Sequence, residues 1–295
     1  MDLRTRLSAQ AGVRVSALAS GSSGNAFLVE AAGTKLLFDA GLNSARLEYY
    51  MRLRGTFASQ LAALFVSHEH IDHLRGAGML ARRYKLPVVA TEGTFLAGAE
   101  QFGPLPDKVV QPLGREVTVG DVTVRSFAVS HDAAETAGFW IEAAGYNIVL
   151  CTDLGCETNS IREALEAADL LVLEANHDVQ RLWRGPYHPA LKKRVASPYG
   201  HLANADTARL ISELARDARP RTIWLAHLSA VNNTPALALA AVTEPLDREG
   251  CAHLQIAVLE RDKPSHTWHG PAGEALGTQE TSPVPTRRHP EPAVL

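Results

Sequence analysis

Short apolar runs alternate with polar turns along most of the chain. From residue 13 onward these runs are rich in β-branched residues and end at Gly, Asn or Asp, as strands joined by turns do. The predicted strands span residues 13–19, 26–29, 34–38, 64–66, 87–90, 117–119, 122–129, 138–141, 147–150, 170–174, 222–226 and 255–259. Helical periodicity, in several places behind a Ser, Thr or Asn cap, predicts helices at residues 44–54, 74–84, 159–168, 204–216 and 235–246.

The order of these elements predicts the fold class. Strands follow one another directly in the first half of the chain, whereas strands and helices alternate in the second half. This order favours an α/β sandwich with mixed sheets over a doubly wound parallel sheet. Gly21 and Gly24 do not form a dinucleotide-binding turn, because a predicted strand follows them where a helix should begin.

Composition narrows the class of protein. The chain of 295 residues is 46% hydrophobic and 21% charged, as in a globular protein that buries a core, and its net charge of -3 argues against wholesale electrostatic binding of nucleic acid. Three cysteines are too few for a disulfide framework, and the sequence shows neither a membrane-spanning run nor a leader, so we expect a cytoplasmic protein without membrane contact. The expected domain covers residues 13–277, followed by a disordered Pro-rich tail at residues 278–295.

A dense group of potential metal ligands follows the predicted strand at residues 64–66. It contains His68, His70, Asp72 and His73, a set that scattered surface histidines do not explain. Imidazole nitrogens together with carboxylate oxygens suit Zn²⁺, Mn²⁺ or Fe. His68 and His70 in an extended turn can face one cation, while Asp72 and His73 at a helix start can face another. The sequence therefore predicts a dinuclear site.

The remaining ligands are expected where other strands end. His131, Asp153 and His227 each close a predicted strand. One such residue is more often a solvated turn residue, but three of them after a His-rich cluster point to a shared site. Two cations about 3.5–4 Å apart would share a bridging water, lower its pKa and supply a hydroxide nucleophile. Asp39, which closes the strand at residues 34–38, is expected either to orient a ligand histidine or to be a plain turn carboxylate.

This pattern resembles that of the metallo-β-lactamase-fold hydrolases over most of the chain. The resemblance implies an αββα four-layer sandwich of two mixed β-sheets that holds two divalent metal ions, Zn or Mn. It implies one metal site formed by His68, His70 and His131. It implies a second site formed by Asp72, His73 and His227, with Asp153 bridging the two ions.

Longer motifs narrow the resemblance to a subgroup. The segments at residues 20–25, 130–132, 152–155, 174–178, 197–204 and 228–233 resemble those of the YycJ/WalJ exonucleases. Membership of that subgroup implies 5′→3′ exonuclease activity on DNA.

A basic segment supplies candidates for substrate binding. Residues 176–201 contain five basic side chains against one acidic side chain, Asp178, namely Arg181, Arg184, Lys192, Lys193 and Arg194. We interpret Lys192, Lys193 and Arg194 as a wall that binds phosphates, with Ser197 beside it; the alternative is a solvated helix face. His201 is expected to donate a proton or to bind phosphate, and it completes the catalytic candidates Asp72 and Asp153.

Four further polar residues are candidate substrate contacts. Ser22 and Asn25 lie in a loop that either holds an anion or is only a tight turn between strands. His177 is expected to orient substrate or support Asp153, unless it is a structural histidine. Asn232 is expected to present its amide to substrate, unless it caps the helix that follows Pro235.

These observations favour a dinuclear metal phosphodiesterase that acts on nucleic acid, most specifically a DNA exonuclease. The alternative is a small-molecule hydrolase, such as a lactonase, thioesterase or cyclic phosphodiesterase, because one scaffold can host many chemistries. A metal-bound regulatory module is disfavoured, since all seven expected ligand positions are filled. The sequence does not indicate an oligomeric state.

Overall fold

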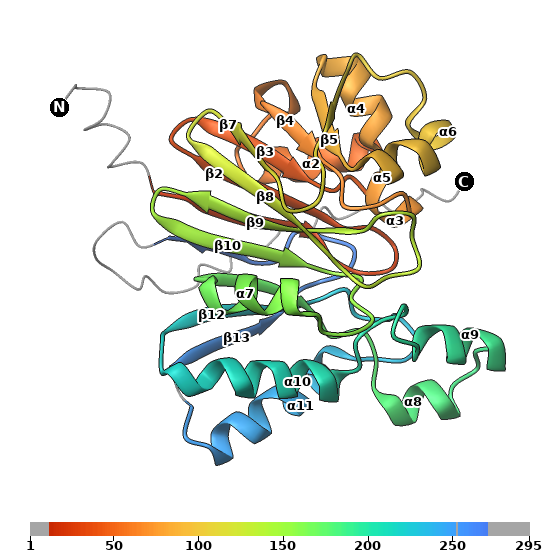
Figure 1. The fold of residues 1–295 in the computed structure, drawn as a ribbon, viewed down its shortest axis with the longest axis vertical. Helices are drawn as coiled ribbons and strands as arrows, with labels where there is room; N and C mark the ends of the chain where they lie inside the picture. The colour runs from red at the N-terminus through yellow and green to blue at the C-terminus, as the bar shows by residue number, and fades with distance from the viewer. Residues whose placement is uncertain (1–11, 252, 271–295) are drawn as a thin grey trace, which may run out of the picture.

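Two seven-stranded mixed sheets pack face to face, with helices on both outer faces (Figure 1), which confirms the predicted αββα sandwich. The computed structural model describes residues 12–251 and 253–270. The predicted end of the domain and the Pro-rich tail at residues 278–295 lie outside the described residues. Among the helices of the described ranges, none has both the length and the hydropathy needed to cross a bilayer.

The first six strands and the last strand form one sheet, and the strands between them form the other. The first sheet, in spatial order, contains β14 (Thr267–His269), β1 (Arg14–Ala19), β2 (Ala26–Ala31), β3 (Thr34–Phe38), β4 (Ala63–Phe65), β5 (Pro87–Ala90) and β6 (Asp107–Val110). The second contains β13 (Leu254–Val258), β12 (Arg221–Ala226), β11 (Leu170–Glu174), β10 (Tyr146–Cys151), β9 (Ala137–Ala143), β8 (Val122–Ala128) and β7 (Glu116–Val119). Each sheet therefore combines parallel and antiparallel neighbours.

Helices cover the outer face of each sheet. Those of the first half are α2 (Ser44–Leu53), α3 (Ile71–Leu74), α4 (Ala77–Tyr84), α5 (Glu92–Ala97) and α6 (Ala99–Phe102). Those of the second half are α7 (Asn159–Ala167), α10 (Asn204–Leu214) and α11 (Pro235–Arg248), while α8 (Val179–Arg184) and α9 (Pro189–Val195) project beyond the end of α10 (Figure 1). Short 3₁₀ turns occur at Ala58–Gln60 and Ala215–Asp217.

The apolar faces of the two sheets form the central layer of the core. Phe38 of β3 stacks on Phe65 of β4 with ring centroids 4.9 Å apart, and Phe139 of β9 meets Phe38 edge-on at 5.2 Å. These three rings join the two sheets, because β3 and β4 belong to the first sheet and β9 to the second. Such aromatic pairs add to the stabilisation that area burial gives.

Parallel pairing brings the ends of several strands to one edge. β3 pairs with β4 in parallel, and β10, β11 and β12 form a parallel run in the second sheet. Because the register is in step, Glu174 at the end of β11 lies opposite Ala226 at the end of β12. Residues that follow these strands are thus neighbours in space.

The structure differs from the expected elements in a few places. The helix expected at residues 74–84 begins earlier and is divided into α3 and α4 at Gly76. A Cβ at Gly76 would lie 2.4 Å from the carbonyl oxygen of Leu42, so the close approach of that loop requires glycine here. The elements β6, β14, α5, α6, α8 and α9 were not predicted, because they are short and carry little periodicity.

Candidate metal centre

The seven predicted metal ligands meet at one edge of the sandwich. His68 and His70 lie in the loop after β4, and Asp72 and His73 lie in α3. The other three follow strands of the second sheet, namely His131 after β8, Asp153 after β10 and His227 after β12. Both sheets therefore contribute to one cluster of buried or half-buried side chains.

Two groups of three residues, neither of which includes Asp153, are spaced as metal ligands. In His68, His70 and His131 one ring nitrogen from each side chain lies within 4.8 Å of the others, and Nε2 of His131 is 3.2 Å from Nδ1 of His70. Asp72, His73 and His227 form the second such group. These are the two sets that the family resemblance implies.

Asp153 lies between the two groups. Its Oδ1 is 3.7 Å from Nε2 of His131, while its Oδ2 is 2.9 Å from Nε2 of His73 and 2.8 Å from Nδ1 of His227. One carboxylate thus faces both sets of ligands, as a bridging ligand must.

The donor set fits divalent cations. Nε2 of His68 is fully buried and has no hydrogen-bond partner among the described residues, although buried polar atoms are normally paired. Nitrogen and oxygen donors without a thiolate suit Zn²⁺ and Mn²⁺. A cation held by these groups would account for the unpaired nitrogen.

Three strands that feed the cluster end in strained backbone. Asp39, Asp153 and His227 have φ of 59°, 56° and 53°, a left-handed conformation that is costly for residues other than glycine. Each stands one or two residues after its strand, so the turn directs its side chain toward the shared edge. Such strain is characteristic of functional sites.

Asp39 orients residues of the cluster by accepting hydrogen bonds from them and from the loop that carries them. Its Oδ2 accepts a hydrogen bond from Nδ1 of His73 at 2.7 Å, and its Oδ1 accepts one from the backbone N–H of Ser67 at 2.8 Å. The Ser67 hydroxyl also lies 3.0 Å from Nδ1 of His68. The expectation that Asp39 orients a histidine of the cluster is confirmed, and the plain turn carboxylate is excluded.

Burial and neighbouring charges shift the pKa values of the cluster in opposite directions. Burial lowers the pKa of His68 and of His131, which favours the neutral rings that bind metal. Burial also lowers the pKa of His73, but the carboxylates of Asp153, Asp39 and Asp72 outweigh it and raise that pKa well above its ordinary value. The pKa of Asp153 lies well below its ordinary value, because the attraction of His227 and His73 overcomes the effect of burial.

Glu174 is a site residue that the sequence pattern alone did not indicate. It is fully buried at the end of β11, where its Oε1 accepts a hydrogen bond from Nδ1 of His201 at 2.8 Å. Its Oε2 accepts one from the backbone N–H of Leu154 at 2.6 Å. Burial lowers the pKa of His201, but the carboxylate of Glu174 outweighs burial and raises that pKa to about 9. An acidic residue that closes an otherwise apolar strand was the signal available in the sequence.

The loop between β1 and β2 supports the cluster. The Asn25 side chain is buried, with Oδ1 accepting from the N–H of Gly21 at 2.9 Å and Nδ2 lying 3.0 Å from Nε2 of His73. Ser22 is exposed at the tip of the same loop. Asn25 therefore closes the turn and touches the cluster, while a substrate contact at either residue stays a prediction.

His177 and Asn232 are both buried, and they lie in two segments that a backbone hydrogen bond joins. The carbonyl of Asn232 accepts a hydrogen bond from the N–H of Asp178, next to His177, at 2.9 Å. Neither Nδ1 of His177 nor either amide atom of Asn232 has a partner in the described part of the chain. Asn232 does not cap α11, since the side chain of Thr234 accepts from the N–H of Leu237 instead.

The predicted basic wall lies on α9, and its members differ in their contacts. Lys192 donates to the carbonyl of Trp183 at 2.8 Å, Arg194 pairs with Asp132, and Lys193 is exposed. Ser197 donates to the carbonyl of Arg194 at 2.8 Å, just before the turn that carries His201. The wall therefore begins next to His131, because Asp132 follows that histidine directly.

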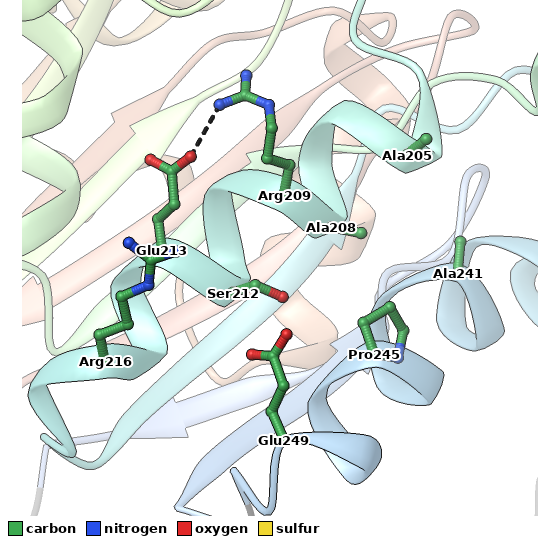
Figure 2. Close-up of a pocket in the computed structure, with 9 residues that line it drawn as sticks. All are labelled: Ala205, Ala208, Arg209, Ser212, Glu213, Arg216, Ala241, Pro245 and Glu249. Atoms are coloured by element: carbon green, nitrogen blue, oxygen red, sulfur yellow. Dashed lines mark hydrogen bonds and ion pairs between the residues drawn. The ribbon is translucent and has the colours of Figure 1, made fainter.

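A separate hollow between α10 and α11 has a different character (Figure 2). Its lining combines small residues with the charged side chains Arg209, Glu213, Arg216 and Glu249. Arg209 and Glu213 pair with each other at 3.0 Å, which the dashed line in Figure 2 marks. Histidine and cysteine are absent from its lining residues, so the hollow offers no set of metal ligands comparable to the cluster.

Comparisons with known proteins agree with the fold and the site. Residues 34–228 match the beta-lactamase superfamily domain. An exodeoxyribonuclease YycJ from Bacillus anthracis is 37% identical over 241 residues, which cover 81% of this chain and 91% of that protein. An exodeoxyribonuclease WalJ from Streptococcus pneumoniae is 37% identical over 231 residues, which cover 77% of this chain and 86% of that protein.

A solved structure shares the architecture. The metallo-β-lactamase fold protein YhfI from Bacillus subtilis superposes with a TM-score of 0.66, covering 88% of this chain and 100% of that chain. Because the two sequences are only 17% identical, this likeness bears on the fold alone.

Proposed function

The chain belongs to the beta-lactamase superfamily, and from that premise we propose that it is a dinuclear metal-dependent phosphodiesterase acting on nucleic acid, specifically a 5′→3′ DNA exonuclease. The observation that carries the proposal is the meeting of two three-residue ligand groups around the single carboxylate of Asp153. The names of the relatives that are 37% identical support DNA as the substrate.

In this proposal two divalent ions, Zn²⁺ or Mn²⁺, occupy the cluster. His68, His70 and His131 would hold one ion, and Asp72, His73 and His227 the other, with Asp153 shared between them. When bound, such a pair of ions supplies Lewis-acid stabilisation and an activated water for attack on a phosphodiester.

His201 is the proposed proton donor. Glu174 accepts the hydrogen bond from Nδ1, so Nε2 is the nitrogen that can give its proton to the oxygen that leaves from phosphorus. The buried carboxylate of Glu174 raises the pKa of His201 to about 9, which favours the protonated ring that a proton donor requires. Glu174 is thus a positioning residue, whereas His201 would touch the reacting atoms.

The basic wall supports a polyanionic substrate. Lys192, Lys193 and Arg194 lie on the helix that leads to His201, so phosphates next to the cleaved bond would meet positive charge.

The three cysteines are free thiols, which supports the reducing cytosol as the compartment of the proposed enzyme.

The test is an assay of the purified full chain loaded with Zn²⁺ or Mn²⁺. We expect single nucleotides to be released from the 5′ end of end-labelled DNA, and elemental analysis to find close to two ions per chain. A variant at Asp121, an exposed carboxylate in the turn between β7 and β8, is the matched control and should retain full activity.

Two results would contradict the proposal. Only trace metal after loading would exclude the dinuclear site. Intact DNA and RNA combined with rapid hydrolysis of a lactone or thioester would identify a small-molecule hydrolase instead, since the scaffold alone does not select the substrate.

A further inference from the structure

The helices α8 and α9 form an arm beside the metal cluster. In Figure 1 they project at the lower right, beyond the end of α10. The arm is fixed at both ends, because Arg194 of α9 pairs with Asp132 after His131, and the N–H of Asp178 donates to the carbonyl of Asn232 in the loop after β12. The arm therefore has a set position relative to the cluster.

Contacts within the arm hold its two helices together. Lys192 of α9 donates to the carbonyl of Trp183 in α8 at 2.8 Å. Asp178 caps α8 by accepting from the N–H of Arg181 at 2.8 Å, and Pro189 opens α9 as a favourable first residue. A surface on this arm is thus organised before any ligand arrives, which lowers the entropic cost of binding.

Large aromatic side chains are exposed on and next to the arm. Trp183 is 49% exposed, and Val179, one turn earlier on the same face of α8, is 44% exposed. Tyr199 is 63% exposed and lies only two residues before His201. Exposed aromatic rings are typical of surfaces that bind planar groups.

The charge of the arm indicates the kind of partner. Residues 176–201 hold five basic side chains and one acidic side chain, while the whole chain has a net charge of -3. Arg184 and Lys193 are exposed on the two helices. Positive charge beside aromatic faces matches single-stranded nucleic acid, which presents phosphates and unstacked bases together.

We propose that this arm binds single-stranded DNA, with bases stacked on Trp183 and Tyr199 and phosphates contacted by Arg184 and Lys193. The inference rests on the proposed exonuclease function and adds a preference for unpaired strand ends. In a duplex each base is covered by its neighbours, so only the phosphate contacts remain available. The arm would therefore discriminate between single and double strands.

The experiment compares the full, metal-loaded chain with Trp183→Ala and Trp183→Phe. The probes are a fluorescent 15-nucleotide oligo-dT and a 15-base-pair duplex, and both the dissociation constant and the KM for cleavage are measured. Tyr49→Ala is the matched control, because Tyr49 is also an exposed aromatic residue, 51% exposed, but lies on α2.

We expect Trp183→Ala to raise the dissociation constant for oligo-dT at least about fivefold, the loss of one stacked base. The value for the duplex should change less than about twofold, Trp183→Phe should restore single-strand binding, and Tyr49→Ala should have no effect. Equal losses on both probes, or no loss on either, would overturn the inference while wild-type cleavage of DNA still supported the exonuclease.

Two further readouts separate the alternatives. Wild-type protein that binds oligo-dT through Trp183 but cleaves no DNA would support the arm and refute the exonuclease. Light scattering that shows a wild-type dimer and a Trp183→Ala monomer would overturn the inference, because the aromatic face would then be a contact between two copies of the chain.

Discussion

The metal cluster and the α8–α9 arm lie beside each other but are built in opposite ways. The residues His68, His73, Asp153 and His227 are at most 2% exposed and come from segments that follow strands of both sheets. The arm is one continuous segment whose candidate contacts are exposed. The cluster therefore has rigid surroundings that fix reacting groups, whereas the arm offers a local surface whose contacts act largely independently.

The largest effect is expected from breaking the centre of the cluster. Asp153→Ala removes a carboxylate that faces both ligand groups, so kcat should fall by at least about 10³-fold. Single-turnover cleavage of labelled DNA measures the loss, and circular dichroism checks that the fold survives. Near-normal turnover in a folded variant would show that Asp153 does not bridge the two groups.

A smaller effect is expected at the boundary between the two regions. His201→Ala should lower kcat by about 10²-fold with little change in KM, because a proton donor acts on the chemical step. Steady-state kinetics on DNA separates the two constants. A variant that raised KM alone would place His201 in substrate binding rather than in proton transfer.

The arm should respond mainly in binding. Replacement of Lys192, Lys193 and Arg194 by Ala should raise KM for long DNA several-fold and flatten its dependence on salt, because fewer counterions are released. Hydrolysis of bis-nitrophenyl phosphate is the control reaction, since that substrate is too small to span the wall. Unaltered KM and salt dependence would mean that this run is only a solvated helix face.

The smallest effect is expected far from both regions. Arg221 donates to both carboxylate oxygens of Asp217, and these hydrogen bonds lower the pKa of Asp217 to about 2. A carboxyl group whose pKa is lowered by folding stabilises the folded state at pH values above its ordinary pKa. This contribution is lost as the pH falls from about 4 toward 2. Asp217 is half exposed, so solvent screening limits the contribution to about 0.5 kcal/mol.

Asp217→Asn should accordingly lower the free energy of unfolding at pH 7 and make little difference near pH 2. Urea unfolding at pH 7 and near pH 2 measures the change, while exonuclease activity should be unaffected. A loss of activity in this variant would mean that the second sheet transmits changes from this turn to the cluster.

Much of the site was predictable because its ligands follow strands. A buried strand can be recognised in the sequence as an apolar run. A His or Asp soon after such a run lies where the strand ends, at the edge of the sheet. His131, Asp153 and His227 were found in this way, although up to 96 residues separate them, from His131 to His227. The dense motif from His68 to His73 supplied the rest.

The supporting contacts were harder to predict. The link between Glu174 and His201 crosses 27 residues, and that between Arg194 and Asp132 crosses 62. The short helices α8 and α9 also escaped prediction, because six or seven residues show too little periodicity. Without those helices, the exposure of Trp183 and its contact with Lys192 had no sequence signal.

The sequence by itself determined the alternation of strands and helices, the identity of the candidate metal ligands and the excess of charge in one segment. Only the tertiary structure decided which ligands share Asp153, which carboxylate holds His201 and which basic residues are already paired. The physical reason is that apolar periodicity and ligand chemistry are local properties, whereas hydrogen bonds between loops depend on the parallel register that places those loops together.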